Sequence, residues 1–298
     1  MGRRLQRAVH SEQVAGWAFA GPAMLLIGLF GIIPIIWSFV LSFQKSNLLA
    51  PEKPFVGLDN YHRLADDPLF RDSVHHTILY TLLFVPLSVG GALLIAVALN
   101  RPLRFIRLYR TAVFVPVVTS TVATAILFSW IFDPDYGLVN GLLSHVGIAP
   151  QGFLQDTNQA LWVIVAMTVW GWIGFDVLIY LAALQDVPRE LVEAAAIDGA
   201  GRLRTFWHVI LPVLRPATLF LTVWSTINAL QLFDEIYVTT KGGPLNATRV
   251  VVYYLYQETF ESFHAGYAAA IAFALLAAIL LVTGVQFLLA GRAARSGA

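Results

Sequence analysis

Stretches of predominantly apolar residues alternate with short polar segments along the whole chain. A helix needs about 20 apolar residues to cross the roughly 30 Å hydrocarbon core of a bilayer. Six stretches reach that length, and they cover approximately residues 17–43, 74–99, 112–132, 160–183, 214–233 and 266–290. We therefore predict an all-α membrane protein with six transmembrane helices, arranged as a single transmembrane domain over residues 1–298.

The composition agrees with a membrane protein and excludes several other classes. Hydrophobic residues make up 58% of the chain and charged residues 12%, with a mean hydropathy of +0.70, far from an average soluble domain. A formal net charge of +1 and dispersed basic residues argue against nucleic-acid binding. The chain has 0 cysteines, which excludes a disulfide, a thiolate metal site and a cysteine nucleophile.

Prolines interrupt the first three apolar stretches. Proline lacks a backbone N–H, and membrane helices accommodate it through a kink or through a neighbouring helix. The first stretch also follows three arginines, as in a secretory signal. It is longer than a signal core and no convincing small-residue cleavage site follows it, so we expect it to be retained. Kinks are expected at Pro22, Pro34, Pro86 and Pro116.

The distribution of arginine predicts the orientation in the membrane. Short loops rich in Lys and Arg stay in the cytoplasm, and the loop at about 133–159 contains neither. We expect a multi-pass protein of the bacterial plasma (inner) membrane with both termini cytoplasmic. The cytoplasmic arginines, some of which also suit contacts with membrane lipid headgroups, are then Arg3, Arg4, Arg7, Arg101, Arg104, Arg107, Arg110, Arg189, Arg202, Arg204, Arg215, Arg292 and Arg295.

One polar segment, residues 186–212, lies between the fourth and fifth apolar stretches and has the pattern of two short helices. Asp186 and Pro188 suit a helix start, since Asp accepts hydrogen bonds from unpaired amides and Pro fits the first turn. Asp198 followed by Gly199 suits the end of that helix, because glycine readily adopts a positive φ.

The second helix of this segment is expected over residues 202–210 and is expected to end at Pro212. Lipid cannot satisfy the polar groups of the segment, and its small side chains allow the backbone of another protein to approach closely. We therefore expect the segment to fill a groove of a protein partner and to transmit motion. The alternative is an amphipathic hairpin that only connects two membrane helices.

The segment resembles the EAA motif of the permease subunits of binding-protein-dependent ABC importers. That motif reads Glu-Ala-Ala, two residues, Asp-Gly-Ala, and then Phe and Leu-Pro. The matching residues are Glu193, Ala194, Ala195, Asp198, Gly199, Ala200, Phe206, Leu211, Pro212 and Pro216, whereas Val209 stands where isoleucine is commoner. Residues 55–61 and 240–244 with Thr248 also resemble the carbohydrate-uptake branch, in particular the maltose-type and glycerol-3-phosphate-type permeases.

The resemblance implies a type I ABC importer permease in which residues 186–212 couple the membrane helices to a cytoplasmic ATPase. The implied partners are a second, homologous permease in a heterodimer, two ATPase subunits and an extracytoplasmic solute-binding protein. The chain has no G-x-x-x-x-G-K-[ST] phosphate loop, so ATP and Mg are expected on the ATPase. We expect a non-catalytic subunit that holds no cofactor and no metal.

Four residues within the apolar stretches are candidates for the solute path. Asp176 is a carboxylate within the fourth stretch, where an unpaired charge usually faces a cavity; the alternative is a structural hydrogen bond too near the cytoplasmic end to touch solute. Asn228 and Gln231 offer donors and acceptors to sugar hydroxyls, and helix–helix hydrogen bonding explains them almost as well. Trp224 can stack on a sugar face, although tryptophan is also abundant where helices meet lipid.

Other polar groups have simpler interpretations. His75 and His76 are adjacent, and neighbouring helical side chains point about 100° apart, so we do not expect them to share a metal ion. Asp234 and Glu235 could meet a basic patch of the binding protein, but a hydrated helix end predicts the same charges, and we favour hydration.

Two other function classes are weighed against the importer. An ion-coupled secondary transporter of polar solutes needs inverted repeats and buried ion ligands, and the sequence offers only Asp176. A membrane enzyme lacks a visible cluster of His and carboxylates or a nucleophile elbow. The sequence leaves open a neutral sugar, an oligosaccharide, glycerol 3-phosphate or a glycerophosphodiester as solute; the absence of a central Lys or Arg in the apolar stretches favours neutral carbohydrate.

Overall fold

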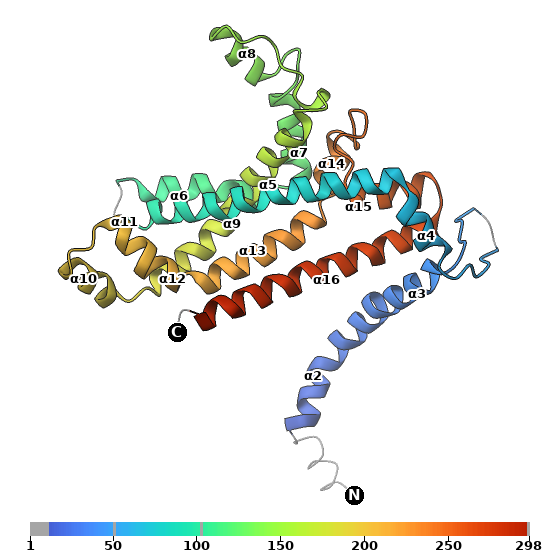
Figure 1. Cartoon of the computed structure of the whole chain (residues 1–298), viewed down its shortest axis with the longest axis horizontal. Helices are drawn as coiled ribbons and strands as arrows, with labels where there is room; N and C mark the ends of the chain where they lie inside the picture. The colour runs from blue at the N-terminus through green and yellow to red at the C-terminus, as the bar shows by residue number, and fades with distance from the viewer. Residues whose placement is uncertain (1–11, 50–51, 102–103, 297–298) are drawn as a thin grey trace, which may run out of the picture. The chain divides into compact units, whose positions relative to one another are not determined.

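The computed structural model describes residues 12–49, 52–101 and 104–296. These ranges are built from helices and loops, and their isolated antiparallel bridge joins Gln44 to Phe55. The predicted all-α fold is confirmed (Figure 1). Some of the residues that predict the orientation lie outside the described residues, namely Arg3, Arg4 and Arg7.

The chain forms two compact units, each made from two separate parts of the sequence. The first unit combines Met1–Asp66 with Gln257–Phe273, and the second combines Asp67–Tyr256 with Ala274–Ala298. The described helices of the first unit are α2 (Glu12–Ile27), the π-helical turn η1 (Gly28–Ile32), α3 (Ile33–Ser42), α4 (Asp59–Asp66), the π-helical turn η5 (Gln257–Glu261) and the start of α16 (Ala265–Ser296).

A buried carboxylate links the separate parts of the first unit. Glu258 accepts hydrogen bonds from a guanidinium nitrogen of Arg63, at 3.3 Å, and from Nδ1 of His264, at 2.9 Å. The Arg63 guanidinium also lies 3.9 Å from the centre of the Tyr267 ring. These contacts join α4 to η5 and to the beginning of α16.

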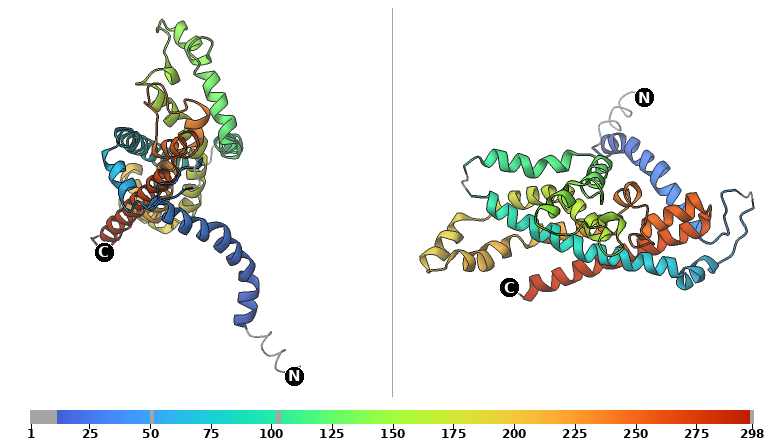
Figure 2. Two further views of the ribbon diagram at one scale, coloured as in Figure 1. Left: turned by 90° about the vertical axis from the view of Figure 1, so that its right-hand side faces the viewer. Right: turned by 90° about the horizontal axis from the view of Figure 1, so that it is seen from above.

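The second unit contains the long helices that carry the candidate sites. α5 packs against α9 and α13 along much of its length, and these helices lie side by side in Figures 1 and 2. The elements are α5 (Pro68–Leu99), α6 (Ile106–Phe114), η2 (Val115–Val118), α7 (Thr121–Ile131), α8 (Leu138–His145), η3 (Phe153–Gln155), α9 (Ala160–Gln185), α10 (Arg189–Ile197), α11 (Arg202–Thr205), η4 (Phe206–Ile210), α12 (Leu211–Val213), α13 (Arg215–Leu230), α14 (Asp234–Val238), α15 (Val251–Tyr256) and the remainder of α16.

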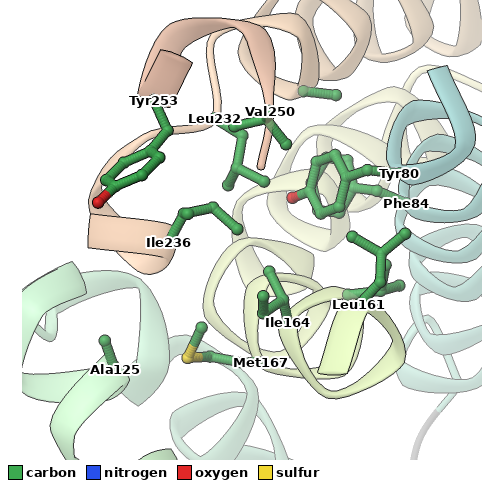
Figure 3. Packing of buried hydrophobic residues seen from close by; sticks show 12 residues of the cluster. Tyr80, Phe84, Ala125, Leu161, Ile164, Met167, Leu232, Ile236, Val250 and Tyr253 are labelled. Carbon is green, nitrogen blue, oxygen red and sulfur yellow. The ribbon is translucent and has the colours of Figure 1, made fainter. Parts of the chain in front are cut away.

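Two apolar clusters hold these helices together. In the first, Tyr80 and Phe84 of α5 stack with ring centroids 5.5 Å apart and pack with Ile164, Met167 and Ile236, as Figure 3 shows. The second cluster lies further along α5 and α9. Since both helices contribute to both clusters, they fix the positions of the side chains between them.

Among the described residues, four helices are long and apolar enough to cross a membrane. Two bent helix pairs raise the number to six if each pair crosses as one span, which is consistent with the six predicted stretches. The four helices are Gly16–Ser42, Pro68–Leu99, Ala160–Gln185 and Ala265–Gly291; the pairs are Ile106–Val118 with Thr121–Ile131, bent by 105°, and Arg202–Val213 with Arg215–Val238, bent by 68°.

The third apolar stretch is not one continuous helix, contrary to expectation. Helix α6 runs into η2, which contains Pro116, and the backbone then becomes extended at Thr119 (ψ 138°) and Ser120 (ψ 135°) before α7 begins. Two consecutive extended residues interrupt the helical hydrogen bonding between η2 and α7. The interruption produces a sharp bend rather than a kink.

The loop predicted to be external is ordered by one asparagine. Asn140 is 8% exposed, and its Nδ2 donates to the carbonyls of Pro134 and Gln151, both at 2.9 Å. The backbone N–H of Gln151 donates in return to Oδ1 of Asn140, also at 2.9 Å. These bonds hold the ends of the loop around α8, which stands apart from α10 in Figures 1 and 2.

Candidate functional site

Residues 186–212 form two short helical arms between α9 and α13 (Figure 1). The first arm, α10, begins directly after Pro188, whose backbone is extended at φ −61° and ψ 125°. Asp186 does not cap this helix: it is the C-cap residue of α9, and no side-chain bond caps the start of α10. The expected Asp cap was wrong because the chain reaches α10 through the extended proline.

A Schellman motif ends α10. The N–H of Gly199 donates to the carbonyl of Ala196 at 3.1 Å, and the N–H of Ala200 donates to the carbonyl of Ala195 at 2.9 Å. Asp198 is the C-cap residue, and Gly199 has a φ of +77°. This left-handed conformation is the one that the motif requires and that glycine adopts without a steric penalty. The expected glycine turn is present, and it sets the direction of the second arm.

The second arm extends further than expected. α11 leads into the π-helical turn η4 and then into α12, so Pro212 lies inside α12 rather than at the end of the arm. Proline is accommodated in a first helical turn, where its missing N–H is not needed. The direction changes instead at the buried Leu214, where the arm meets α13 at 68°.

The arms expose both charged and large apolar side chains. Glu193 and Asp198 are exposed, and so are Ile197 (86%), Leu203 (73%) and Trp207 (57%). Single exposed apolar residues are ordinary, but several on one short segment are typical of a surface that contacts another protein. We call these five residues the loop surface.

Asp176 is joined to a neighbouring helix of the same chain. It is 2% exposed in α9, and its carboxylate accepts a hydrogen bond from Ser88 Oγ of α5 at 2.5 Å. It lines neither of the cavities described next. This geometry agrees with the structural alternative, and a role of Asp176 in the solute path stays a prediction.

Two adjoining cavities, of about 140 and 180 Å³, lie among α5, α7, α9 and the junction of α13 with α14. One water needs at least about 10–15 Å³ by this measure, so each cavity has room for several waters or for polar groups of a solute. Asn228 and Gln231 both line the larger cavity. Trp224 does not line it; its ring stacks on Phe220, with centroids 6.3 Å apart, and lies 5.8 Å from Phe175.

Glu235 occupies a position that the sequence did not reveal. It is 7% exposed and lines both cavities, whereas the adjacent Asp234 is exposed and lines only the larger one. The expectation of a hydrated helix end therefore holds for Asp234 and was wrong for Glu235. The non-helical backbone of Phe233 (φ −144°, ψ −58°) precedes α14, and the short helix that follows buries Glu235.

A spacing signal for Glu235 is visible in retrospect. Asn228, Gln231 and Glu235 follow one another at intervals of three and four residues, the spacing of one helical face. The other residues that line both cavities are Thr121, Thr168 and Trp172. Thr168 and Trp172 lie four residues apart on α9, whereas Thr121 lies on α7. Sequence spacing therefore connects Thr168 with Trp172 and connects neither of them with Glu235.

The adjacent histidines form no metal site with other side chains of the described residues. Their ring centroids lie 5.6 Å apart, and Nδ1 of His76 is 3.2 Å from the backbone oxygen of Arg249. No group of three or more His, Cys, Asp or Glu side chains in the described part of the chain is arranged to hold a metal ion. The hydrogen bond to the backbone oxygen of Arg249 gives the His76 side chain a structural role.

Several known proteins are similar to this chain over nearly its full length. The lactose transport system permease protein LacF of Rhizobium radiobacter is 39% identical over 280 residues, covering 92% of this chain and 93% of that protein. The arabinooligosaccharides transport system permease protein AraP of Bacillus subtilis (strain 168) is 36% identical, covering 95% and 90%. The sn-glycerol-3-phosphate transport system permease protein UgpA of Brucella abortus biovar 1 is 32% identical, covering 95% and 97%.

The fold is shared with a solved transporter. A chain of a bacterial ABC transporter involved in the import of the acidic polysaccharide alginate matches with a TM-score of 0.85 at 22% identity, over 97% of this chain and 99% of that one. Residues 88–295, which include the loop surface and Glu235, match the family described as the binding-protein-dependent transport system inner membrane component. The chain therefore belongs to this family of membrane permeases, as the EAA resemblance predicted.

Proposed function

We propose that the chain forms half of the translocation path of an ATP-driven ABC importer and that residues 186–212 couple it to a separate ATPase. The observation that carries this proposal is the exposed pair of arms between α9 and α13, with Gly199 in the left-handed turn. A rigid, partly apolar projection of this kind suits insertion into a groove of a partner. Closure of the ATPase around it would move the helices to which the arms are attached.

The proposed complex contains further subunits. Since the sequence has no phosphate loop of the Walker type, ATP and Mg are assigned to two ATPase subunits in the cytoplasm. A second, homologous permease completes the path as a heterodimer, and an extracytoplasmic solute-binding protein delivers the solute. The arginine distribution supports an orientation with both termini and the loop surface in the cytoplasm.

The proposed solute is a sugar or an oligosaccharide, with a glycerol-phosphate derivative as the alternative. The names of LacF and AraP specify lactose and arabinooligosaccharides, and that of UgpA specifies sn-glycerol 3-phosphate. The described residues that line the two cavities include Asn, Gln, Thr and Trp but no Lys or Arg. Such a lining suits neutral hydroxyl groups better than a phosphate.

Uptake by the reconstituted complex tests the coupling role. The chain is co-purified with its second permease and ATPase, placed in proteoliposomes and supplied with the binding protein. Glu193→Lys on α10 is expected to abolish ATP-dependent uptake while leaving the amount of assembled membrane protein unchanged. Glu190→Lys makes the same charge change at an exposed position of the same helix and is expected to retain uptake.

Two results would contradict the proposal. Normal uptake by Glu193→Lys would remove the coupling role from the loop surface. Uptake by the wild-type chain that follows an ion gradient and needs no ATPase would instead support the secondary transporter, which the family match disfavours.

A further inference from the structure

Glu235 is a buried carboxyl group at the boundary of the two cavities. Its residue is 7% exposed and lines both of them. The ion pairs found among the described residues both involve Glu258 of the first unit, so they supply no cation to Glu235. An ionisable group within a membrane-spanning region is costly unless it faces polar partners or a hydrated cavity. The position of Glu235 therefore indicates that its carboxyl group binds a ligand and does not merely fill space in the core.

The surroundings of Glu235 offer hydroxyl groups. Tyr80 and Thr168 line the larger cavity together with Glu235. The Thr168 hydroxyl donates to the carbonyl of Ile164 at 2.5 Å, so its oxygen remains available as an acceptor. These residues form a polar cluster in an otherwise apolar region, and Figure 3 shows Tyr80 and Ile164 within the surrounding apolar packing.

The cavities also hold groups that complement a carboxylate. Trp172, shared by both cavities, carries an indole N–H donor, and Asn228 and Gln231 carry amides with both donors and acceptors. None of the described lining residues is Lys, Arg or His. The site is therefore polar and acidic without a compensating positive charge from these residues.

We propose that Glu235 determines solute specificity in this site, where its carboxylate accepts hydrogen bonds from the hydroxyl groups of neutral polyols and disfavours anionic solutes. The inference rests on the proposed transport function and specifies its solute class. Hydrogen bonds to a charged acceptor are stronger than neutral ones. A phosphate held about 5 Å from the carboxylate, at an effective dielectric constant of about 20, is disfavoured on the order of a hundredfold.

Uptake of a defined pair of probes tests the proposal in the assembled transporter. Lactose and arabinotriose represent neutral solutes, and sn-glycerol 3-phosphate represents an anionic one. Glu235→Gln keeps the size of the side chain but removes its charge, and it is expected to lower the efficiency of neutral uptake about tenfold. The ratio of neutral to anionic uptake is expected to fall as well. Asp135→Asn also replaces a carboxylate by an amide, at an exposed position that lines neither cavity, and it is expected to leave that ratio unchanged.

A second variant guards against simple misfolding. Thr168→Val alters the lining of the same two cavities without removing a charge, and it is expected to keep the wild-type neutral-to-anionic ratio even if it lowers the uptake of both probe classes. Thermal unfolding of each assembled variant checks its integrity. A destabilised variant would lower uptake of both probe classes equally, so the ratio separates specificity from stability.

The outcomes distinguish this inference from the proposed function. If wild-type transporter imports neutral probes and Glu235→Gln has the same ratio, or if wild-type transporter prefers sn-glycerol 3-phosphate, the role of Glu235 is overturned while the importer function stands. If wild-type transporter shows no ATP-dependent uptake of any of these probes, the proposed sugar or glycerol-phosphate importer function and this inference both fail.

Discussion

The left-handed turn at the end of α10 allows a sharp test of the loop geometry. Gly199 has φ +77°, whereas Gly201, two residues later, has φ −68° and ψ 163° at the start of α11. A Cβ added at either glycine would meet no other atom within 4 Å. The two positions therefore differ in backbone conformation and not in available space.

The same substitution is expected to have opposite effects at these positions. A Cβ in the left-handed region costs about 1–2 kcal/mol, so Gly199→Ser should destabilise the turn by about that amount. Gly201→Ser places a favoured N-cap residue on an extended backbone, so it should leave the loop unchanged or stabilise it by a few tenths of a kcal/mol. Gly199→Asn should destabilise the turn less than Gly199→Ser does, since asparagine adopts the left-handed conformation more easily.

Hydrogen exchange measures this difference directly. The amides of Gly199 and Ala200 close the Schellman motif, and a loss of about 1–2 kcal/mol corresponds to a 5–30-fold loss of their protection when exchange follows opening of the turn. Peptides covering residues 189–205 are compared in the assembled transporter. Equal protection in the Gly199→Ser and Gly201→Ser variants would refute the assignment of the turn to backbone geometry.

Two further predictions concern the packing of α9. A Cβ at Gly174 would collide with the backbone oxygen of Val113 and with the Val117 side chain, whereas a Cβ at Gly171 would meet no other atom within 4 Å. Gly174→Ala should therefore lower the free energy of unfolding by about 1–3 kcal/mol, and Gly171→Ala should leave it unchanged. Thermal unfolding in nanodiscs measures the difference. Ser88→Ala should lower stability by about 1–3 kcal/mol because it leaves the buried Asp176 without its donor. Ser73→Ala is the control on the same helix, because Ser73 Oγ donates only to the Leu69 carbonyl of its own helix; equal losses in both serine variants would contradict the role of Asp176.

The long helices could be predicted because their signal is local. The hydropathy of α5 and α9 persists over more residues than a membrane crossing needs, and no tertiary contact is required to recognise it. The Asp198–Gly199 turn was equally visible, since glycine after a short helix has few other structural uses. A structural element can be predicted from sequence where one residue type or one run of residues determines its conformation.

The bend in the third apolar stretch was missed for a physical reason. Averaged hydropathy does not record backbone conformation, and Thr119 and Ser120 are as compatible with a helix end as with its interior. The extended residues lie between η2 and α7, both of which contact α9. Hydropathy along the chain does not record such tertiary contacts.

The structure brings together only some of the residues that we predicted for the solute path. Asn228 and Gln231 share a cavity, but Asp176 and Trp224 do not line it, and Glu235 was assigned to solvent although it is buried. A carboxylate near a predicted helix end is usually hydrated, so its burial becomes apparent only when the break at Phe233 is known. Tyr80 and Thr168 also line the larger cavity, and in the sequence their positions match ordinary helix packing.

Single-cysteine cross-linking tests whether the loop surface contacts the ATPase, because the chain has no cysteine of its own. Ala196→Cys places a thiol on the exposed face of α10, and Ser144→Cys places one on the exposed end of α8. In the assembled transporter, the thiol at position 196 is predicted to cross-link to an ATPase subunit in at least one nucleotide state, and the thiol at position 144 in none. Failure of the thiol at position 196 to reach the ATPase with and without ATP, or cross-linking of the ATPase from position 144, would contradict the coupling mechanism.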